Sequence, residues 1–154
     1  MMSDVTGRMT ADFPLWSPEQ MFTLAADIER YPDFIPWCKS ARVVSRQDTM
    51  WQVENHFGAG PVDATFRTIA RPDPPRSLEI TATQAPFRHF RLEWRFAPLP
   101  GGGCRVAASY ALALRSPILH GLARLAMPEA TRKVILRFKE RAATLYGGDT
   151  SRML

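Results

Sequence analysis

The sequence contains little cysteine, no long apolar run and no common catalytic motif. Its two cysteines can form at most one disulfide, which excludes a disulfide-rich fold. Neither Cys38 nor Cys104 lies in a C-x-x-C pair or near a histidine at ligand spacing, which argues against a zinc site. No stretch approaches the ~18 consecutive apolar residues of a membrane-spanning helix, and residues 1–4 carry no apolar secretion signal. We therefore expect a cytoplasmic protein.

Patterns typical of nucleophilic, phosphate-binding and zinc-dependent enzymes are also missing. The chain has no G-x-S-x-G, Walker or H-E-x-x-H motif. The run Gly101–Gly103 joins two predicted strands and opens no helix, so it predicts a hairpin and not a phosphate loop. Glu29 and Asp33 flank a turn, where we expect solvated or capping roles. The histidines are scattered without an orienting partner, and we expect surface or loop positions for His56, His89 and His120. We find no catalytic residue and expect a protein that is not an enzyme.

The composition that remains is that of an ordinary globular domain. Hydrophobic residues make up 45% of the chain and charged residues 23%, with a formal net charge of +5. This apolar content is too high for disorder, and no repeat or linker divides the 154 residues. We expect one monomeric domain over residues 1–154, ordered from about residue 9 to residue 147.

The first third of the chain predicts a strand, a short helix and a stiff turn. A strand is expected over residues 9–15. Ser17, Pro18 and Gln20 form a capping-box pattern, which predicts a helix over residues 18–26. Pro32 and Pro36 then bracket a compact turn at residues 31–38. Its apolar side chains either form a structural corner or a rigid apolar lip, and they are Tyr31, Phe34, Ile35 and Trp37.

From about residue 41 to residue 115 the apolar residues recur with a period of two. Such alternation indicates an antiparallel sheet with one covered face, and turn-rich breaks at residues 58–61, 72–75 and 98–103 separate its strands. The inward positions are rich in aromatic side chains, namely Trp51, Phe57, Phe66, Phe90, Trp94, Phe96 and Tyr110. Asn55 and Thr68 also fall on this face. Either backbone groups at a bulge pair with them, or they anchor a ligand head group together with the Tyr110 hydroxyl.

The last segment changes to helical spacing. A helix is expected over residues 118–146, with Gly147 and Gly148 at its end and a kink or break at Pro128, near Met127. Its apolar stripe comprises Leu122, Leu125, Ala126, Ala130, Val134, Ile135, Phe138, Ala142 and Leu145. Its basic residues either form a solvated face or contact anionic lipid or RNA. They are Arg124, Arg132, Lys133, Arg137, Lys139 and Arg141.

These elements predict an α+β domain in which a curved antiparallel sheet wraps the C-terminal helix. The aromatic inward positions leave two arrangements open. The side chains either fill a closed core, or the sheet stands off the helix and encloses an apolar cavity.

Residues 31–38, Tyr-Pro-Asp-Phe-Ile-Pro-Trp-Cys, carry a family resemblance. With the preceding residues 26–29, they resemble the signature of the coenzyme Q-binding START-domain family, within the polyketide cyclase/dehydrase-like, helix-grip superfamily. Weaker matches follow at residues 86–88, 94–98 and 104–106 and in the terminal helix, so the resemblance covers about residues 9–147.

The resemblance implies a helix-grip fold that binds ubiquinone or a similar isoprenoid lipid in an apolar tunnel under the C-terminal helix. Ubiquinone would be a bound ligand and not an obligatory cofactor. The implied role is a quinone carrier or chaperone that supports respiration, in the cytoplasm or peripheral to the inner membrane, with contact to anionic lipid. A bacterial branch of the family acts as a toxin that blocks association of ribosomal subunits, so a ribosome partner is the alternative. An enzyme of the cyclase/dehydratase kind is a third reading.

Ligand contacts are expected from aromatic and apolar side chains of the turn, the inward sheet face and the helix, together with one amide. The expected residues are Phe34, Trp37, Asn55, Phe57, Phe66, Phe87, Leu92, Trp94, Tyr110, Leu112, Leu122, Val134 and Phe138.

Overall fold

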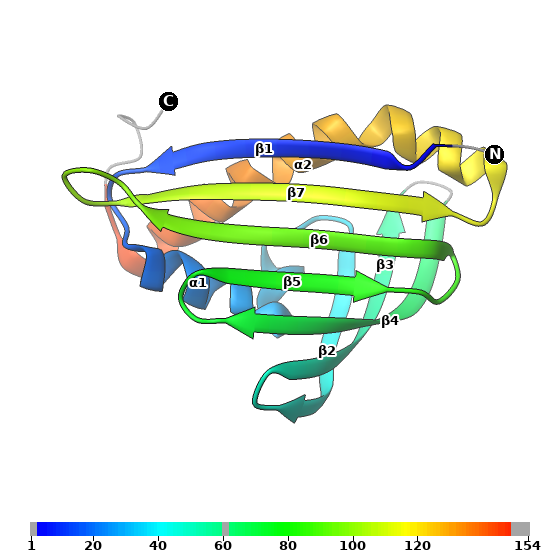
Figure 1. Ribbon diagram of the computed structural model, residues 1–154, viewed down its shortest axis with the longest axis horizontal. Coiled ribbons are helices and arrows are strands. Elements are labelled where there is room, and N and C mark those ends of the chain that lie inside the picture. The colour runs from blue at the N-terminus through cyan, green and yellow to red at the C-terminus, as the bar shows by residue number, and fades with distance from the viewer. Residues whose placement is uncertain (1–2, 60–61, 149–154) are drawn as a thin grey trace.

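The computed structural model describes residues 3–59 and 62–148. Its elements are β1 (Val5–Phe13), α1 (Pro18–Ala26), the 3-10 helix η1 (Ile28–Asp33), β2 (Cys38–Gln47), β3 (Met50–Ala59), β4 (Val62–Asp73), β5 (Ser77–Ala82), β6 (Phe87–Pro98), β7 (Cys104–Leu114) and α2 (Pro117–Tyr146). All strands belong to one antiparallel sheet of seven strands in the order β1-β7-β6-β5-β4-β3-β2. The sheet curves in front of α2, and α1 closes one end (Figure 1). The predicted α+β helix-grip fold is confirmed.

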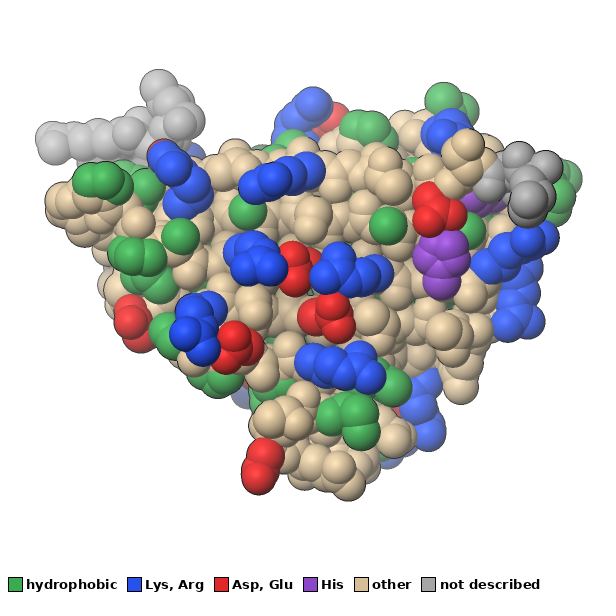
Figure 2. Space-filling view, viewed as in Figure 1, with side chains coloured by type: hydrophobic (Ala, Val, Ile, Leu, Met, Phe, Trp, Pro, Cys, Tyr) green, Lys and Arg blue, Asp and Glu red, His purple; other side chains and the backbone are tan. Residues whose placement is uncertain are grey.

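Strand alternation sorts the side chains onto two faces, as predicted. Trp94 is buried on the inner face, and its ring centroid lies 4.7 Å from that of Phe138 on α2. The outer face carries mixed charges over β5, β6 and β7 (Figure 2). There Arg91 Nε lies 2.9 Å from Glu79, and Arg105 Nε lies 2.7 Å from Asp12. One apolar and one charged face fix the register, because a slip by one residue would exchange them.

The capping box at the start of α1 is present. Ser17 Oγ accepts a hydrogen bond from the Gln20 backbone N–H at 3.1 Å, and Gln20 Oε1 accepts one from the Ser17 backbone N–H at 2.9 Å. The helix then buries Phe22, whose ring meets Phe96 edge-on at 5.9 Å. The predicted bounds 18–26 are those observed.

The first strand lies earlier than predicted, at residues 5–13 instead of 9–15. It pairs with β7 along its whole length, from Val5 opposite Leu112 to Phe13 opposite Cys104. Its side chains do alternate from the start, with Val5, Met9 and Phe13 on the covered face and polar residues between them. The prediction overlooked this start, because Gly7 interrupts the apolar series there.

The triple glycine forms the predicted hairpin between β6 and β7. All three residues have positive φ, from 86° to 107°. A Cβ at Gly103 would also lie 2.5 Å from the Pro14 Cα, so this position excludes a side chain on two grounds. The predicted turn at residues 58–61 lies partly outside the described residues.

The terminal helix departs from prediction at two points. It continues from Pro117 to Tyr146 with Pro128 inside it, so of the predicted kink or break the break is wrong. Packing against β1, β7 and α1 holds it together, although a proline removes one backbone donor. The apolar stripe is also only partly buried, since Leu125 is 81% exposed. Leu125 and Phe138 are 13 residues apart. At 3.6 residues per turn, their side chains are separated by roughly 220° around the helix axis, so they face opposite sides.

Candidate functional site

An apolar cavity of about 540 Å³ lies between the inner face of the sheet and α2. This volume is within the ~300–1,000 Å³ typical of small-molecule sites. Its floor comes from β6 and β7, through side chains such as Leu92, Ala108 and Leu112, and its roof comes from α2. Of the two arrangements that the sequence left open, the structure has the cavity.

Small side chains on α2 explain why the space is not filled. Ala123, Ala126 and Ala130 line the cavity at successive turns of the helix. Larger residues follow at Val134 and Phe138, where the helix packs closely on Trp94. The roof is therefore open over its first half and closed at Phe138.

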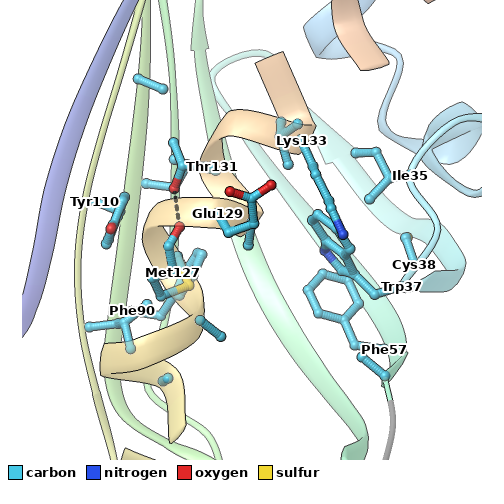
Figure 3. A pocket seen from close by; sticks show the side chains of 18 of the residues that line it. Ile35, Trp37, Cys38, Phe57, Phe90, Tyr110, Met127, Glu129, Thr131 and Lys133 are labelled. Atoms are coloured by element: carbon cyan, nitrogen blue, oxygen red, sulfur yellow. Dashed lines mark hydrogen bonds between the residues drawn. The ribbon is translucent and has the colours of Figure 1, made fainter. Parts of the chain in front are cut away.

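The mouth of the cavity opens between α2 and the segment that leads into the sheet. Trp37 and Phe57 face Glu129 and Lys133 across it (Figure 3). Glu129 accepts a hydrogen bond from Arg132 Nη1 at 2.6 Å. Within residues 3–59 and 62–148, Lys133 makes no ion pair or hydrogen bond. The ionisable groups of α2 thus lie at the rim.

Most of the predicted contact residues line this cavity. They come from the turn, three strands and the helix, and they are Trp37, Phe57, Phe87, Leu92, Trp94, Tyr110, Leu112, Val134 and Phe138. Their contact with a ligand stays a prediction.

Two of the predicted contact residues pack against neighbouring aromatic rings outside the cavity lining. Phe34 lies outside the cavity lining, with its ring 5.2 Å from that of Phe138 and under the Arg141 guanidinium at 5.6 Å. Phe66 is buried in a row of aromatic rings, 5.0 Å from both Phe57 and Phe87. Phe34 and Phe66 therefore do not line the cavity, but each packs against a ring that does.

Asn55 and Leu122 do not line the cavity either. The Asn55 amide donates to the backbone oxygens of Val53 and Phe66, both at 3.2 Å, and to Thr68 Oγ1 at 3.0 Å. Its amide nitrogen therefore has backbone partners, as the first of the two sequence interpretations held, but the β3–β4 register is regular there and has no bulge. Leu122 is 46% exposed on the outer side of α2, since its helical phase turns it away from the sheet.

Pattern analysis missed several lining residues. Ala108, Ala123 and Met127 were not singled out because small or flexible side chains give no distinct signal. Glu129 and Lys133 also line the cavity at its mouth, but charged residues on a helix are usually solvated. The helical phase relative to Phe138 was the one signal that could have found Ala123 and Met127.

The predicted apolar lip is only partly exposed. Ile35 is buried and lines the cavity, whereas Trp37 is half-buried at its mouth. The Tyr31 hydroxyl donates to the Ala25 backbone oxygen, and its ring meets Phe138 edge-on at 5.9 Å. The turn therefore packs as a structural corner and also forms one wall of the cavity.

His120 is buried, which contradicts the predicted surface position. Its Nδ1 accepts a hydrogen bond from the Leu114 backbone N–H at 3.2 Å, and Nε2 lies 2.9 Å from the Ser3 backbone oxygen. Both ring nitrogens therefore have backbone partners within the protein. His120 lies outside the cavity lining. Its contact with the Ser3 backbone oxygen connects the start of α2 to the N-terminal segment.

The two cysteines are free and buried. Burial raises the pKa of each thiol to about 11, so both stay protonated near neutral pH. Cys38 lines the cavity but is a poor nucleophile in this state. In the described part of the chain, no three His, Cys, Asp or Glu side chains are placed to hold a metal, and no helix is long and apolar enough to span a bilayer.

Curated proteins with similar sequences include bacterial toxins and a coenzyme Q-binding protein. The chain is 25% identical over 127 residues to the ribosome association toxin RatA of Pseudomonas aeruginosa, covering 82% of this chain and 88% of the toxin. It is 25% identical over 136 residues to the mitochondrial coenzyme Q-binding protein COQ10 homolog B of Xenopus laevis, covering 86% of this chain and 56% of that protein.

Solved structures share the fold. An 18 kDa protein of Caulobacter crescentus is 28% identical, with a TM-score of 0.76, and the match covers 93% of this chain and 99% of that one. The Zhui aromatase/cyclase of a Streptomyces species is 14% identical, with a TM-score of 0.77 and coverage of 92% and 94%. The family described as polyketide cyclase / dehydrase and lipid transport matches residues 16–139. Fold, cavity and sequence agree, and the chain belongs to this family.

Proposed function

We propose that this protein binds ubiquinone, or a related isoprenoid lipid, as a carrier or chaperone that supports respiratory electron transport. The observation that carries the proposal is the cavity of about 540 Å³ under α2, lined mainly by apolar and aromatic side chains. Burial of apolar surface stabilises such a complex by about 25 cal/mol per Å². The coenzyme Q-binding relative supports the choice of a quinone.

The cavity chemistry favours binding over catalysis. Protonated Cys38 is a weak nucleophile, and the ionisable Glu129 and Lys133 lie at the mouth, where water competes for them. We propose a monomeric binding protein that acts in the cytoplasm and at the surface of the inner membrane, without turning over its ligand.

Organic extraction of the purified protein followed by mass spectrometry tests this function. We expect a quinone in the extract. Direct titration of extracted protein with a ubiquinone analogue provides the second arm. If the extract holds no quinone and the analogue fails to bind, the proposal is wrong.

A second candidate is a ribosome-directed role. It is favoured by the relatives named ribosome association toxin, which are similar over most of their length. The exposed basic residues of α2, such as Arg132 and Lys133, suit an RNA surface. Sedimentation of ribosomal subunits with added protein tests it. A reduced fraction of joined subunits supports this role, and an unchanged gradient without co-sedimenting protein argues against it.

A further inference from the structure

A buried donor without a partner lies on the floor of the cavity. Trp94 is 2% exposed and lines the cavity, and its Nε1 has no hydrogen-bond partner. Over residues 3–59 and 62–148, it is the one buried side-chain nitrogen or oxygen that has no hydrogen-bond partner. Trp16 is equally buried, and its Nε1 donates to the Gly147 backbone oxygen at 2.9 Å. Since unpaired buried donors are costly and rare, Trp94 lacks an acceptor that a ligand can supply.

A second donor lies on the same floor, on the side toward β1. Trp94 on β6 pairs with Ala108 on β7, and Tyr110 lies two residues further along β7, so the two aromatic residues are diagonal neighbours. The Tyr110 hydroxyl makes no hydrogen bond with any residue that the structure describes. The ring lies over Gly7 on β1, where a Cβ would come within 2.3 Å of the hydroxyl oxygen. Glycine at this position therefore lets Tyr110 adopt its orientation.

The ammonium group of Lys133, at the mouth of the cavity, is weaker evidence for a ligand contact. Lys133 is exposed, so water satisfies its ammonium group whether or not a ligand is bound. The Trp94 N–H is shielded from water and has no such alternative. The unsatisfied hydrogen-bonding capacity of the cavity is thus at its floor and not at its rim.

We infer that the ligand binds with its head group innermost, where its oxygens accept hydrogen bonds from Trp94 Nε1–H and Tyr110 O–H, and that its chain leaves between Trp37 and α2. This inference rests on the proposed function and adds an orientation to it. Contact with Nε1 requires a small shift of the surrounding rings, of which Phe138 packs closely, 4.7 Å away between centroids.

The donors also select a chemical class. An indole nitrogen only donates, so it suits a carbonyl or ether oxygen. An oxidised quinone presents acceptors alone, whereas its reduced form brings two hydroxyl donors, for which the floor offers only the Tyr110 oxygen. The oxidised form therefore binds more tightly than the reduced form.

Two probes with the same chain separate this inference from the proposed function. One is a ubiquinone analogue with a saturated decyl chain, and the other is decylbenzene, which has no acceptor. We expect Trp94→Phe and Tyr110→Phe each to weaken quinone binding about 5–10-fold and to leave decylbenzene binding unchanged. Trp16→Phe is the matched control, because it removes a buried indole outside the cavity lining, and Lys133→Ala tests a head group placed at the mouth.

Equilibrium dialysis measures all four variants, with circular dichroism as the check on folding. Quinone binding that is equal in wild type, Trp94→Phe and Tyr110→Phe overturns the inference and leaves the proposed function intact. A loss in Lys133→Ala alone overturns it as well, because it places the head at the mouth. No quinone binding by wild type refutes the proposed function itself. If Trp94→Phe does not fold, the inference is tested by the quinone affinity of Tyr110→Phe and by the affinity of the wild type for oxidised over reduced quinone.

Discussion

At the scale of single residues, Asn55 is a structural amide. It is buried on β3 and joins β3 to β4 through Phe66 and Thr68. Removing a buried partner leaves the others unpaired, at a cost of about 1–3 kcal/mol.

We predict that Asn55→Ala lowers the free energy of unfolding by about 1–3 kcal/mol and leaves quinone affinity unchanged. Urea denaturation measures the first quantity and equilibrium dialysis the second. A large loss of affinity in a folded variant would return Asn55 to the binding site.

Val134 provides a test of the cavity itself. Its side chain lines the roof, and a carboxylate there costs several kcal/mol unless it is neutralised. Val134→Asp should abolish binding of a long isoprenoid chain. Leu136→Asp is the matched control, since Leu136 is 49% exposed on the same helix. Circular dichroism must show that both variants are folded. Unchanged quinone binding by folded Val134→Asp would remove Val134 from the site.

The buried thiols predict a pH dependence of stability. The pKa of Cys38 and that of Cys104 rise from 9.0 to about 11 on folding, because burial disfavours the thiolate. The folded state then holds its protons more tightly than the unfolded state, so this stabilisation is full below pH ~9 and is lost as the pH rises toward ~11.

Thermal unfolding of the wild type between these pH values should show the decline, and Cys38→Ala with Cys104→Ala should flatten it. The native thiols should also resist alkylation at pH ~8 and react after denaturation. Rapid alkylation of the native protein would contradict the burial of these thiols.

At the scale of the element, α2 has two different halves. The second half packs on the core through Ile135, Phe138 and Ala142. The first half covers the cavity with small side chains, and its outer side carries Ile118 and Leu125, which are 77% and 81% exposed. A carrier of an insoluble ligand must meet the bilayer, and an exposed apolar stripe on a basic helix suits that contact.

We predict weak, salt-sensitive binding to anionic liposomes and little binding to neutral ones. Each Lys or Arg near an anionic surface contributes ~1 kcal/mol, and salt weakens it. Charge reversal at Arg132, Lys133 and Arg137 should reduce co-sedimentation more than substitution of Arg42 and Arg46 on β2. An equal loss from both sets would mean that only net charge matters.

The exposed leucines give a separate test of the same helix. Leu122→Ser with Leu125→Ser should weaken co-sedimentation with anionic liposomes, and it should do so more than Leu15→Ser with Val44→Ser. Leu15 and Val44 are also exposed, at 46% and 38%, but they lie outside α2. Equal effects would show that the first half of α2 is not a docking surface.

At the scale of the whole molecule, one sheet and one helix create the cavity. The sheet alone exposes an apolar face, and α2 alone has only a partial apolar stripe. Their packing closes one end at Phe138 and leaves the other open under Ala123, Ala126 and Ala130. Carrier and ribosome-directed roles share this architecture, so the ligand and sedimentation assays must separate them.

The sequence by itself determined the class of fold and the faces of the strands. Alternation placed Trp94 and Tyr110 inward because neighbouring residues of a strand point to opposite sides. The Ser17 cap fixed the start of α1, since the capping bonds are local. These features depend on residues close together in the chain.

Only the tertiary structure decided which inward residues border empty space. Asn55 and Phe66 have neighbours that satisfy or cover them, whereas Trp94 has an unpaired N–H beside the cavity. The burial of His120 likewise depends on a partner far away in the chain. Pairing and packing between distant segments leave no periodic trace in the sequence, so local pattern could not reveal them.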